Sequence, residues 1–312
     1  MPTPAFAYSG VIPILATPFH PDESLDLESL DRMIRFNARL GVDGVTVLGV
    51  LGESNRLSDA ERERVVRTAV QAAAGLPVIV GASHTGTEAT IGLSEQAADL
   101  GATAVMVAPS AQPVPSDKAV IDYYHRLAAR IRLPIVLQDH PASTGVHISV
   151  EVLLQLARDL PKIACIKAEA VPSPPKIAAL KKGLAGIRPV PVLTGLGALY
   201  GLFDLERGSD GFNTGFAFPE VLMALVRTHR AGQSDLTRKI FTRFLPLMVF
   251  EQQPGLAIRK EILRRRGLIA SNRVRHPGGT IDPAAAEQLQ RLLEATFPAG
   301  GLEGPIDPLA GL

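Results

Sequence analysis

The sequence predicts a (β/α)8 barrel with a C-terminal helical extension, and three observations lead to this fold class. Short β-branched runs alternate with longer stretches whose apolar residues recur at spacings of three and four, the pattern of parallel strands joined by helices. Eight such units occur, spaced as a single barrel requires. The glycine fingerprint of dinucleotide-binding sheets is missing after the first predicted strand.

The predicted strands are short and apolar, and a helical stretch follows each of them. One of these stretches opens with Ser58 and has Glu61 three residues later, the capping-box pattern of a helix N-terminus. We expect a barrel domain over residues 1–232. Three further helical stretches, near 234–252, 256–268 and 283–297, then predict an extension over residues 233–312. The strands are expected to begin near Gly10, Asp43, Pro77, Thr103, Pro134, Ile163, Val190 and Asp210.

Composition narrows the classes of partner. A net charge of +1 in 312 residues argues against a nucleic acid or an anionic membrane as partner, since either would need a large basic face. The basic run at 258–267 is interleaved with apolar residues and predicts a solvated helix face. Cys165 is the single cysteine, which excludes an internal disulfide and agrees with a reducing cytoplasm. No secretory signal pattern or apolar run of about 20 residues is present, so a cytoplasmic protein is expected.

Active sites of such barrels lie at the carboxyl ends of the strands, so polar residues expected there are the candidates. Several of them are types that transfer protons or bind carboxylates and hydroxyl groups. They are Thr17, Glu53, Ser83, His84, Gln138, Asp139, His140, Lys167, Glu169, Thr194, Asn213 and Thr214.

Lys167 stands in the predicted sixth strand, where period-two alternation places it on the side of Ile163 and Cys165. If that side is the barrel interior, burial favours a neutral amine, which can attack a ketone and form a Schiff base. The alternative is that Lys167 faces outward or ends in a salt bridge with Glu169. The strand pattern leaves both possibilities open.

Glu53 follows the second strand in a glycine-containing turn, whose backbone amides could bind an anion. Its simpler role is a favourable charge near a helix start. His84 and the pair Asp139 and His140 could transfer protons or bind a metal, so a barrel that activates a keto acid with a divalent metal is an alternative. No close-spaced ligand pair supports that alternative, and no metal or other cofactor is expected.

Four segments together resemble the dihydrodipicolinate synthase / N-acetylneuraminate lyase family, in order and spacing, over nearly the whole chain. They are "ILATPF" at 14–19, the Gly-x-x-Gly-Glu-Ser turn at 49–54, the lysine of the sixth strand, and "RHPGGTIDP" at 275–283. The resemblance implies a (β/α)8 barrel, a homotetramer, and a Schiff base between Lys167 and pyruvate or another 2-keto acid.

The sequence departs from the family pattern at several positions. Gln138 stands where the strand-five tyrosine that relays protons usually lies, and Val50 and Leu51 stand where threonines usually hold the substrate carboxylate. The tyrosine usually found after strand four is also missing from "APSAQPVPSD". Lysine biosynthesis by the usual synthase mechanism is therefore not favoured.

The motifs "SH", "QDHPAS", "KAE" and "TGFAFP" instead resemble the branch that contains 2-keto-3-deoxy-L-arabonate dehydratases. The resemblance implies removal of water from a five-carbon 2-keto-3-deoxy sugar acid to give 2,5-dioxopentanoate. A pyruvate-dependent aldolase or a synthase-like condensing enzyme remains an alternative. A second alternative is a catalytically silent protein that binds a keto acid, because the family's tyrosines and threonines are lost.

Dehydration through a Schiff base needs a base near C3 and an acid near the leaving C4 hydroxyl. The expected proton-transfer groups are Glu169, His84, Asp139 and His140, and Gln138 is expected to position the substrate. The substrate carboxylate is expected on the backbone amides around 50–52. The expected substrate-binding residues are Thr17, Val50, Leu51, Gly52, Glu53, Thr214 and Gly215.

Overall fold

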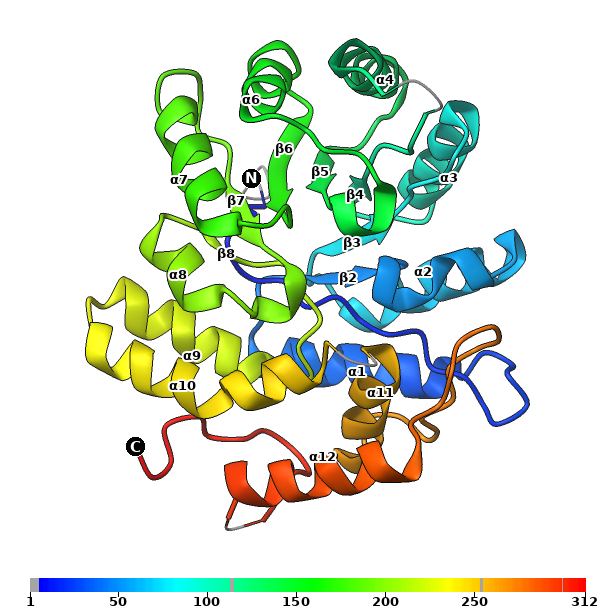
Figure 1. The fold of residues 1–312 in the computed structure, drawn as a ribbon. Coiled ribbons are helices and arrows are strands. Elements are labelled where there is room, and N and C mark those ends of the chain that lie inside the picture. Colours follow the sequence, from blue (N-terminus) through cyan, green and yellow to red (C-terminus); the bar gives the residue numbers. More distant parts are fainter. Residues whose placement is uncertain (1–5, 113–114, 253–254, 299) are drawn as a thin grey trace.

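A computed structural model of the chain describes residues 6–112, 115–252, 255–298 and 300–312, and eight parallel strands form its centre (Figure 1). The strands follow one another in the order β1-β8-β7-β6-β5-β4-β3-β2. A parallel bridge between Ile14 and Thr46 joins the first strand segment to β2, so the sheet closes on itself. The predicted (β/α)8 barrel is therefore confirmed.

All eight strands occur where the sequence places them, although most are shorter than expected. The regular part of the first strand ends before Pro13, which has no N–H group to donate, although the Ile12 and Ile14 N–H groups still donate to the carbonyls of Phe212 and Thr214. The strands are β1 (Gly10–Val11), β2 (Val45–Val47), β3 (Val78–Gly81), β4 (Ala104–Val107), β5 (Ile135–Asp139), β6 (Ile163–Ala168), β7 (Val192–Thr194) and β8 (Gly211–Phe212).

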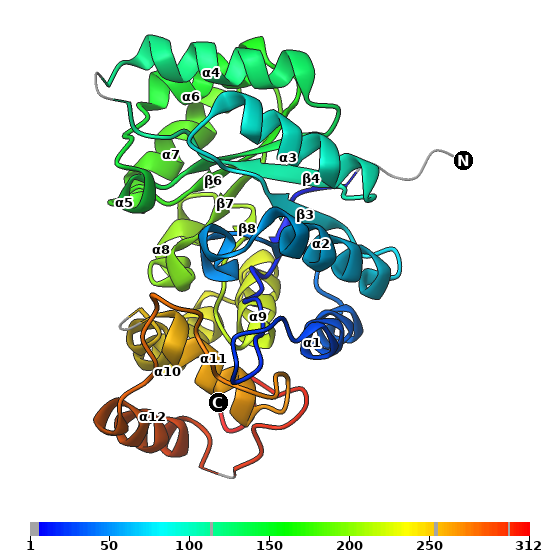
Figure 2. The same cartoon turned by 90° about the vertical axis from the view of Figure 1, so that its right-hand side faces the viewer.

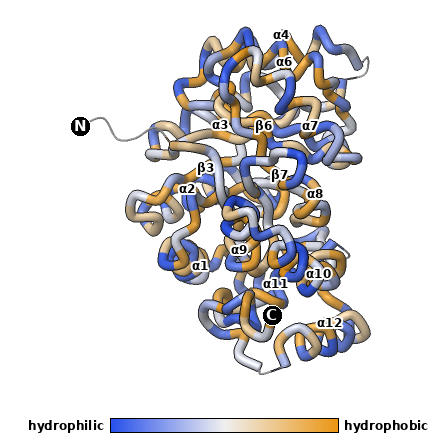
Figure 3. The backbone as a smooth tube through the Cα atoms, turned by 90° about the vertical axis from the view of Figure 1, so that its left-hand side faces the viewer, coloured by the Kyte–Doolittle hydropathy of each residue, from blue (hydrophilic) through white to orange (hydrophobic). Residues whose placement is uncertain are grey.

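Amphipathic helices surround the strands, and the hydropathy of the chain alternates along them (Figure 3). The capping box at the start of α2 is present: the Ser58 hydroxyl accepts from the Glu61 N–H, and the Glu61 carboxylate accepts from the Ser58 N–H. The barrel helices are α1 (Leu27–Leu40), α2 (Asp59–Ala73), α3 (Thr87–Asp99), α4 (Asp117–Arg130), α5 (Pro141–Thr144), α6 (Val150–Asp159), α7 (Ser173–Leu184), α8 (Gly201–Glu206) and α9 (Pro219–Arg230). Three short 3-10 helices are η1 (Val50–Gly52), η2 (Ser54–Arg56) and η3 (Leu196–Ala198).

Strand β6 contains a register shift that alters which side chains face the barrel interior. Val136 pairs with Cys165, whereas the preceding Ile135 pairs with Ile163, so β6 holds one additional residue at Ala164. Cys165 therefore packs in the inner cluster and Ile163 in the outer one. The expectation that both lie on the side of Lys167 is correct for Cys165 and wrong for Ile163.

The three tail helices α10 (Ser234–Phe250), α11 (Leu256–Arg265) and α12 (Pro283–Thr296) follow the barrel at the predicted places. Helix α10 packs against α8, α9 and α12. The three tail helices α10, α11 and α12 lie together on the side of the barrel away from α4 and α6 (Figure 2). Among the described residues, no helix is both long enough and apolar enough to cross a membrane.

Three of the five basic residues at 259–266 are not solvated, contrary to the sequence-based expectation, whereas Arg264 is exposed and Arg265 is partly buried. Arg259, Lys260 and Arg266 are all buried. Each forms an ion pair with a carboxylate from another part of the chain, and this pairing compensates for the loss of water around the cation. The pairs are Arg259 with Glu251 (2.8 Å), Lys260 with Glu53 (2.5 Å) and Arg266 with Glu220 (2.5 Å).

Replacing Arg266 with Met is expected to lower the free energy of unfolding by about 3–5 kcal/mol, because Glu220 would remain buried without its cation. The control is Arg238→Met, which removes an exposed pair with Glu206 and should change it by about 1 kcal/mol or less. Urea unfolding measures both. Equal and small losses would show that the buried pair has no special role in stability.

Candidate functional site

Lys167, Gln138 and Glu169 meet at the carboxyl ends of β5 and β6, and we call these three residues the lysine cluster. Strand pairing places Gln138 directly beside Lys167, and both side chains alternate with residues of the outer core. The Glu169 N–H donates to the Asp139 carbonyl (2.9 Å), which extends the pairing of the two strands by one step. The register of β5 and β6 therefore brings an amine, an amide and a carboxylate together.

Lys167 is buried, faces the interior and pairs with Glu169 at an Nζ to Oε2 distance of 3.0 Å. The two possibilities left open by the sequence, burial and a salt bridge, thus occur together. Gln138 Nε2 donates to the same carboxylate oxygen at 2.7 Å. An amide in this position can donate one hydrogen bond to Glu169 and still offer a donor and an acceptor to a ligand.

The second oxygen of Glu169 is held by the turn after β7. The Leu196 N–H donates to Oε1 at 3.2 Å. Leu196, Gly197 and Ala198 all have positive φ angles, an unusual backbone for the two non-glycine residues. A Cβ atom at Gly195 would lie 2.2 Å from Glu169 Oε1, so this position accepts only glycine while the carboxylate stays in place.

The electrostatics of the lysine cluster favour an ionised Glu169. Burial alone raises the pKa of this carboxyl group. The positive charge of Lys167, the electrostatic influence of His140 and hydrogen bonds from Gln138 and Lys167 outweigh burial, so the pKa of Glu169 lies below its ordinary value. The result is a carboxylate that can accept a proton inside the barrel mouth.

Asp139 lies on the opposite side of β5 from Gln138, because consecutive strand residues alternate. It is fully buried and pairs with Lys176 of α7, with Nζ 2.6 Å from Oδ2. Burial raises the pKa of Asp139, and the charge of Lys176 opposes that effect. The structure thus separates Asp139 from the lysine cluster and gives it a partner that the sequence reasoning missed, since nothing in "SPPKIAAL" marks Lys176 as the partner.

The two candidate histidines differ in their surroundings. His140 is partly buried, and its Nδ1 lies 2.7 Å from the Ser143 hydroxyl. Burial lowers the pKa of His140; the charge of Glu169 opposes this and that of Lys167 adds to it. His84 is exposed, and its Nδ1 accepts from the Gly86 N–H at 3.0 Å. Of the two, only His140 interacts electrostatically with the lysine cluster.

The turn at Val50–Gly52 forms η1 and is fixed from both sides. The Thr17 hydroxyl donates to the Gly52 carbonyl at 2.6 Å, and Leu51 packs against the inner core. Gly215 leaves room for Leu51, since a Cβ atom there would lie 2.2 Å from Cδ1 of that side chain. The structure therefore brings Thr17, the turn and Gly215 together.

Several other candidate side chains at the strand ends form hydrogen bonds within the protein. The Thr214 hydroxyl accepts from the Gly197 N–H at 2.7 Å, which ties β8 to the turn beside Glu169. Ser83 accepts from the Ala108 N–H, Thr194 donates to the Ser209 hydroxyl, and Asn213 donates to the Ile12 carbonyl. Glu53 is buried and its carboxylate lies against Lys260, so this side chain is directed to the tail.

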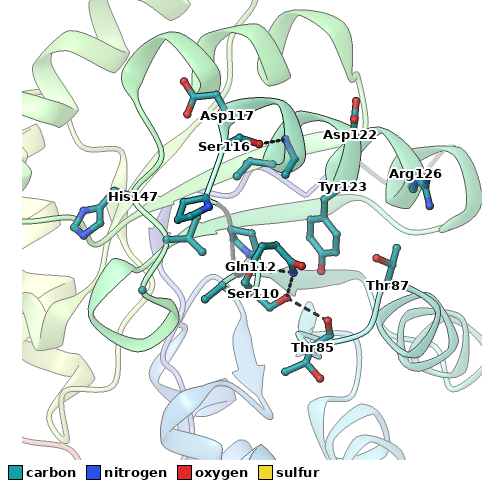
Figure 4. A pocket seen from close by; sticks show the side chains of 17 residues that line it. Thr85, Thr87, Ser110, Gln112, Ser116, Asp117, Asp122, Tyr123, Arg126 and His147 are labelled. Atoms are coloured by element: carbon teal, nitrogen blue, oxygen red, sulfur yellow. Dashed lines mark hydrogen bonds between the residues drawn. The ribbon is translucent and has the colours of Figure 1, made fainter.

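A pocket of about 500 Å³ lies beside α4, at the loops that follow β3, β4 and α5 (Figure 4). The Ser110 hydroxyl donates to the Thr85 carbonyl at 3.2 Å and accepts from Gln112 at 3.3 Å, so these loops form one wall. Tyr123 and His147 line other parts of it, and the lysine cluster is not among its lining residues. Within the described ranges, no three or more His, Cys, Asp or Glu side chains are arranged to hold a metal ion.

The chain is similar to known proteins over nearly its whole length. The dihydrodipicolinate synthetase family model matches residues 7–296. L-2-keto-3-deoxyarabonate dehydratase of Azospirillum brasilense is 32% identical over 90% of this chain and 92% of its own length. 4-Hydroxy-tetrahydrodipicolinate synthase of Chlorobium luteolum is also 32% identical, over 90% and 94%. The crystal structure of dihydrodipicolinate synthase from Rhodopseudomonas palustris has a TM-score of 0.89 and 37% identity, covering 93% of this chain and 98% of that one.

Gly195→Ala is expected to displace the Glu169 carboxylate and to lower the free energy of unfolding by about 1–3 kcal/mol, through steric overlap. Denaturant unfolding and a crystal structure of the variant measure both effects. Gly92→Ala is the control, since a Cβ atom there meets nothing within 4 Å and alanine favours a helix. An undisturbed Glu169 in the Gly195→Ala crystal would contradict the steric argument.

Proposed function

Because the chain belongs to the dihydrodipicolinate synthetase family of Schiff-base lyases, we propose that it dehydrates a 2-keto-3-deoxy sugar acid, such as 2-keto-3-deoxy-L-arabonate. The observation that carries the proposal is the lysine cluster: a buried lysine beside a carboxylate, with the amide of Gln138 at the neighbouring position of β5. The barrel of residues 1–232 would carry the reaction, and residues 233–312 would be its helical extension.

In the first step, Lys167 must be a neutral amine, and the nearest proton acceptor is Glu169 at 3.0 Å. The amine adds to the C2 ketone, and the carbinolamine loses water to give an iminium ion. Because the iminium withdraws electrons, the C3–H bond becomes acidic. The contact with Glu169 supports this step, since the carboxylate lies where it can take a proton from the amine.

In the second step, Glu169 is proposed to take the C3 proton and to return it to the leaving C4 hydroxyl group. Removal of the proton forms the enamine, whose electrons expel C4–OH as water. Tautomerisation converts C5 to an aldehyde, and hydrolysis of the iminium frees 2,5-dioxopentanoate and Lys167. Gln138 lacks the ionisable hydroxyl group of a tyrosine, so the proton transfer falls to the carboxylate beside it.

The substrate carboxylate is proposed to lie on the backbone amides of Val50 and Leu51, at the turn held by Thr17, since the Gly52 N–H already donates to the Gly49 carbonyl at 2.9 Å. Gln138 and Thr214 would position the sugar hydroxyl groups. His140 stands near enough to influence Glu169, whereas Asp139 is engaged with Lys176 and His84 is exposed. We assign no proton transfer to Asp139 or His84, although both are candidates by sequence.

A second candidate function is a pyruvate-dependent aldolase or a synthase-like condensing enzyme. It is favoured by the synthase of Chlorobium luteolum, which is as similar in sequence as the dehydratase of Azospirillum brasilense. Both functions use the same Schiff base and differ in the bond that the enamine breaks or forms. A homotetramer in the cytoplasm, as expected by resemblance to the family, is part of the proposal, and a mass measurement in solution tests the assembly.

Incubation with pyruvate and borohydride is expected to leave a stable adduct on Lys167, because borohydride reduces the iminium to a secondary amine. Lys167→Ala should remain unmodified, and peptide mass analysis locates the adduct. Arg238→Met, with its exposed change, serves as the variant control that keeps the adduct. A wild type that stays unmodified and loses its activity with a chelator would favour a metal-dependent aldolase instead.

The wild-type enzyme is expected to remove water from 2-keto-3-deoxy-L-arabonate and to release no pyruvate from it. Glu169→Gln keeps the size of the side chain but removes the proton acceptor, so kcat should fall about 10²- to 10⁴-fold. A screen of 2-keto-3-deoxy acids that measures water loss and pyruvate release in parallel identifies the substrate and the bond broken. Pyruvate release would favour the aldolase, and binding without turnover would favour the silent binding protein.

A further inference from the structure

The carboxylate of Glu53 lies outside the reaction just described, although it ends the turn proposed to bind the substrate. Glu53 caps η1 with a left-handed backbone, φ 51°, and its side chain is buried. Oε2 accepts from Arg56 at 2.7 Å and from the Arg275 N–H at 2.9 Å. Oε1 accepts from Lys260 Nζ at 2.5 Å. The orientation of the turn is therefore coupled to residues more than 200 positions later in the chain.

Lys260 is the most enclosed member of this group, with an exposed fraction of 0% for its side chain. Besides Glu53, its ammonium group donates to the Arg273 carbonyl at 2.7 Å and lies 4.5 Å from the ring centre of Phe19. The ring is thus one of three contacts that fix the position of Nζ. A buried ammonium with these contacts has little freedom to move and holds Glu53 in one place.

Phe19 connects Lys260 to the chain segment near Thr17, which contacts the turn from its other side. Its ring contacts both Lys260 and the guanidinium of Arg275, whose Cζ is 4.3 Å from the ring centre. Phe19 follows Thr17 by two residues, and the Thr17 hydroxyl donates to the Gly52 carbonyl. Lys260 therefore supports both Glu53 after the turn and the loop that bonds to Gly52.

We propose that Lys260 is a positioning residue for the substrate carboxylate, because it holds Glu53 and Phe19 on either side of the turn whose Val50 and Leu51 amides are proposed to bind that carboxylate. This inference rests on the proposed function. Lys260 does not touch the substrate in this arrangement. Removing its charge leaves Glu53 Oε2 bonded to Arg56 and to the Arg275 N–H, but it leaves Oε1 buried without its cation. We expect the carboxylate to shift toward its remaining partners and to move the turn attached to it.

The test compares Lys260→Met with the wild type by borohydride trapping at increasing concentrations of pyruvate. The pyruvate concentration at half-maximal trapping should rise about 10- to 100-fold, the effect of misaligning hydrogen bonds to a charged group. Hydroxyacetone keeps the ketone but lacks the carboxylate, so its half-maximal concentration should stay near the wild-type value. A variant that raises both concentrations equally has only a general defect, and the proposal would be wrong.

Two further variants separate positioning from stability. Arg266→Met breaks another buried ion pair of the same tail and should lower stability without changing the pyruvate dependence. The double variant Glu53→Gln with Lys260→Met removes both charges, so it should be more stable than Lys260→Met alone while its pyruvate dependence stays weakened. Recovery of pyruvate affinity together with stability would overturn the proposal.

The outcomes also separate this inference from the proposed function. If wild-type protein forms no adduct with either ketone, the Schiff-base function itself fails. If the wild type forms the adduct and Lys260→Met traps pyruvate at the same half-maximal concentration, the function stands and the positioning role of Lys260 is refuted.

Discussion

The site depends on the burial of two opposite charges in contact, Lys167 and Glu169. Either charge alone would be costly at this depth, since an isolated ion loses its hydration without compensation. The ion pair stabilises both charges, and the Glu169 carboxylate also accepts hydrogen bonds from Gln138 and from the Leu196 N–H. The turn after β7, which has positive φ angles, thus supplies a hydrogen bond to this carboxylate.

Much of the fold follows from local pattern. The eight strands, the capping box at Ser58 and the three tail helices are properties of short segments. Alternation correctly places Lys167 on the side of Cys165, but it left open whether that side is the barrel interior. The extra residue at Ala164 was not predictable, because a bulge depends on the partner strand and leaves no mark in an apolar run. Alternation survives it on the functional side because the bulge precedes Cys165.

The parts of the site that escaped prediction are pairings between distant residues. Lys176 with Asp139, and Lys260 with Glu53, join segments that no local rule connects. A basic helix such as α11 usually faces water, and composition alone predicts that outcome. What reverses it here is the position of Glu53, Glu220 and Glu251 in the folded chain, which only the three-dimensional structure reveals.

Gly195 and Glu169 form a single steric unit, because the turn can approach the strand end only where one partner has no side chain. The residues at these two positions are therefore expected to change together among related proteins. A relative that shortens residue 169 is free to acquire a side chain at 195, whereas a relative that keeps a glutamate is not. Covariation at these two positions would therefore mark which members of a divergent family retain a carboxylate beside the lysine, and hence which could share its chemistry.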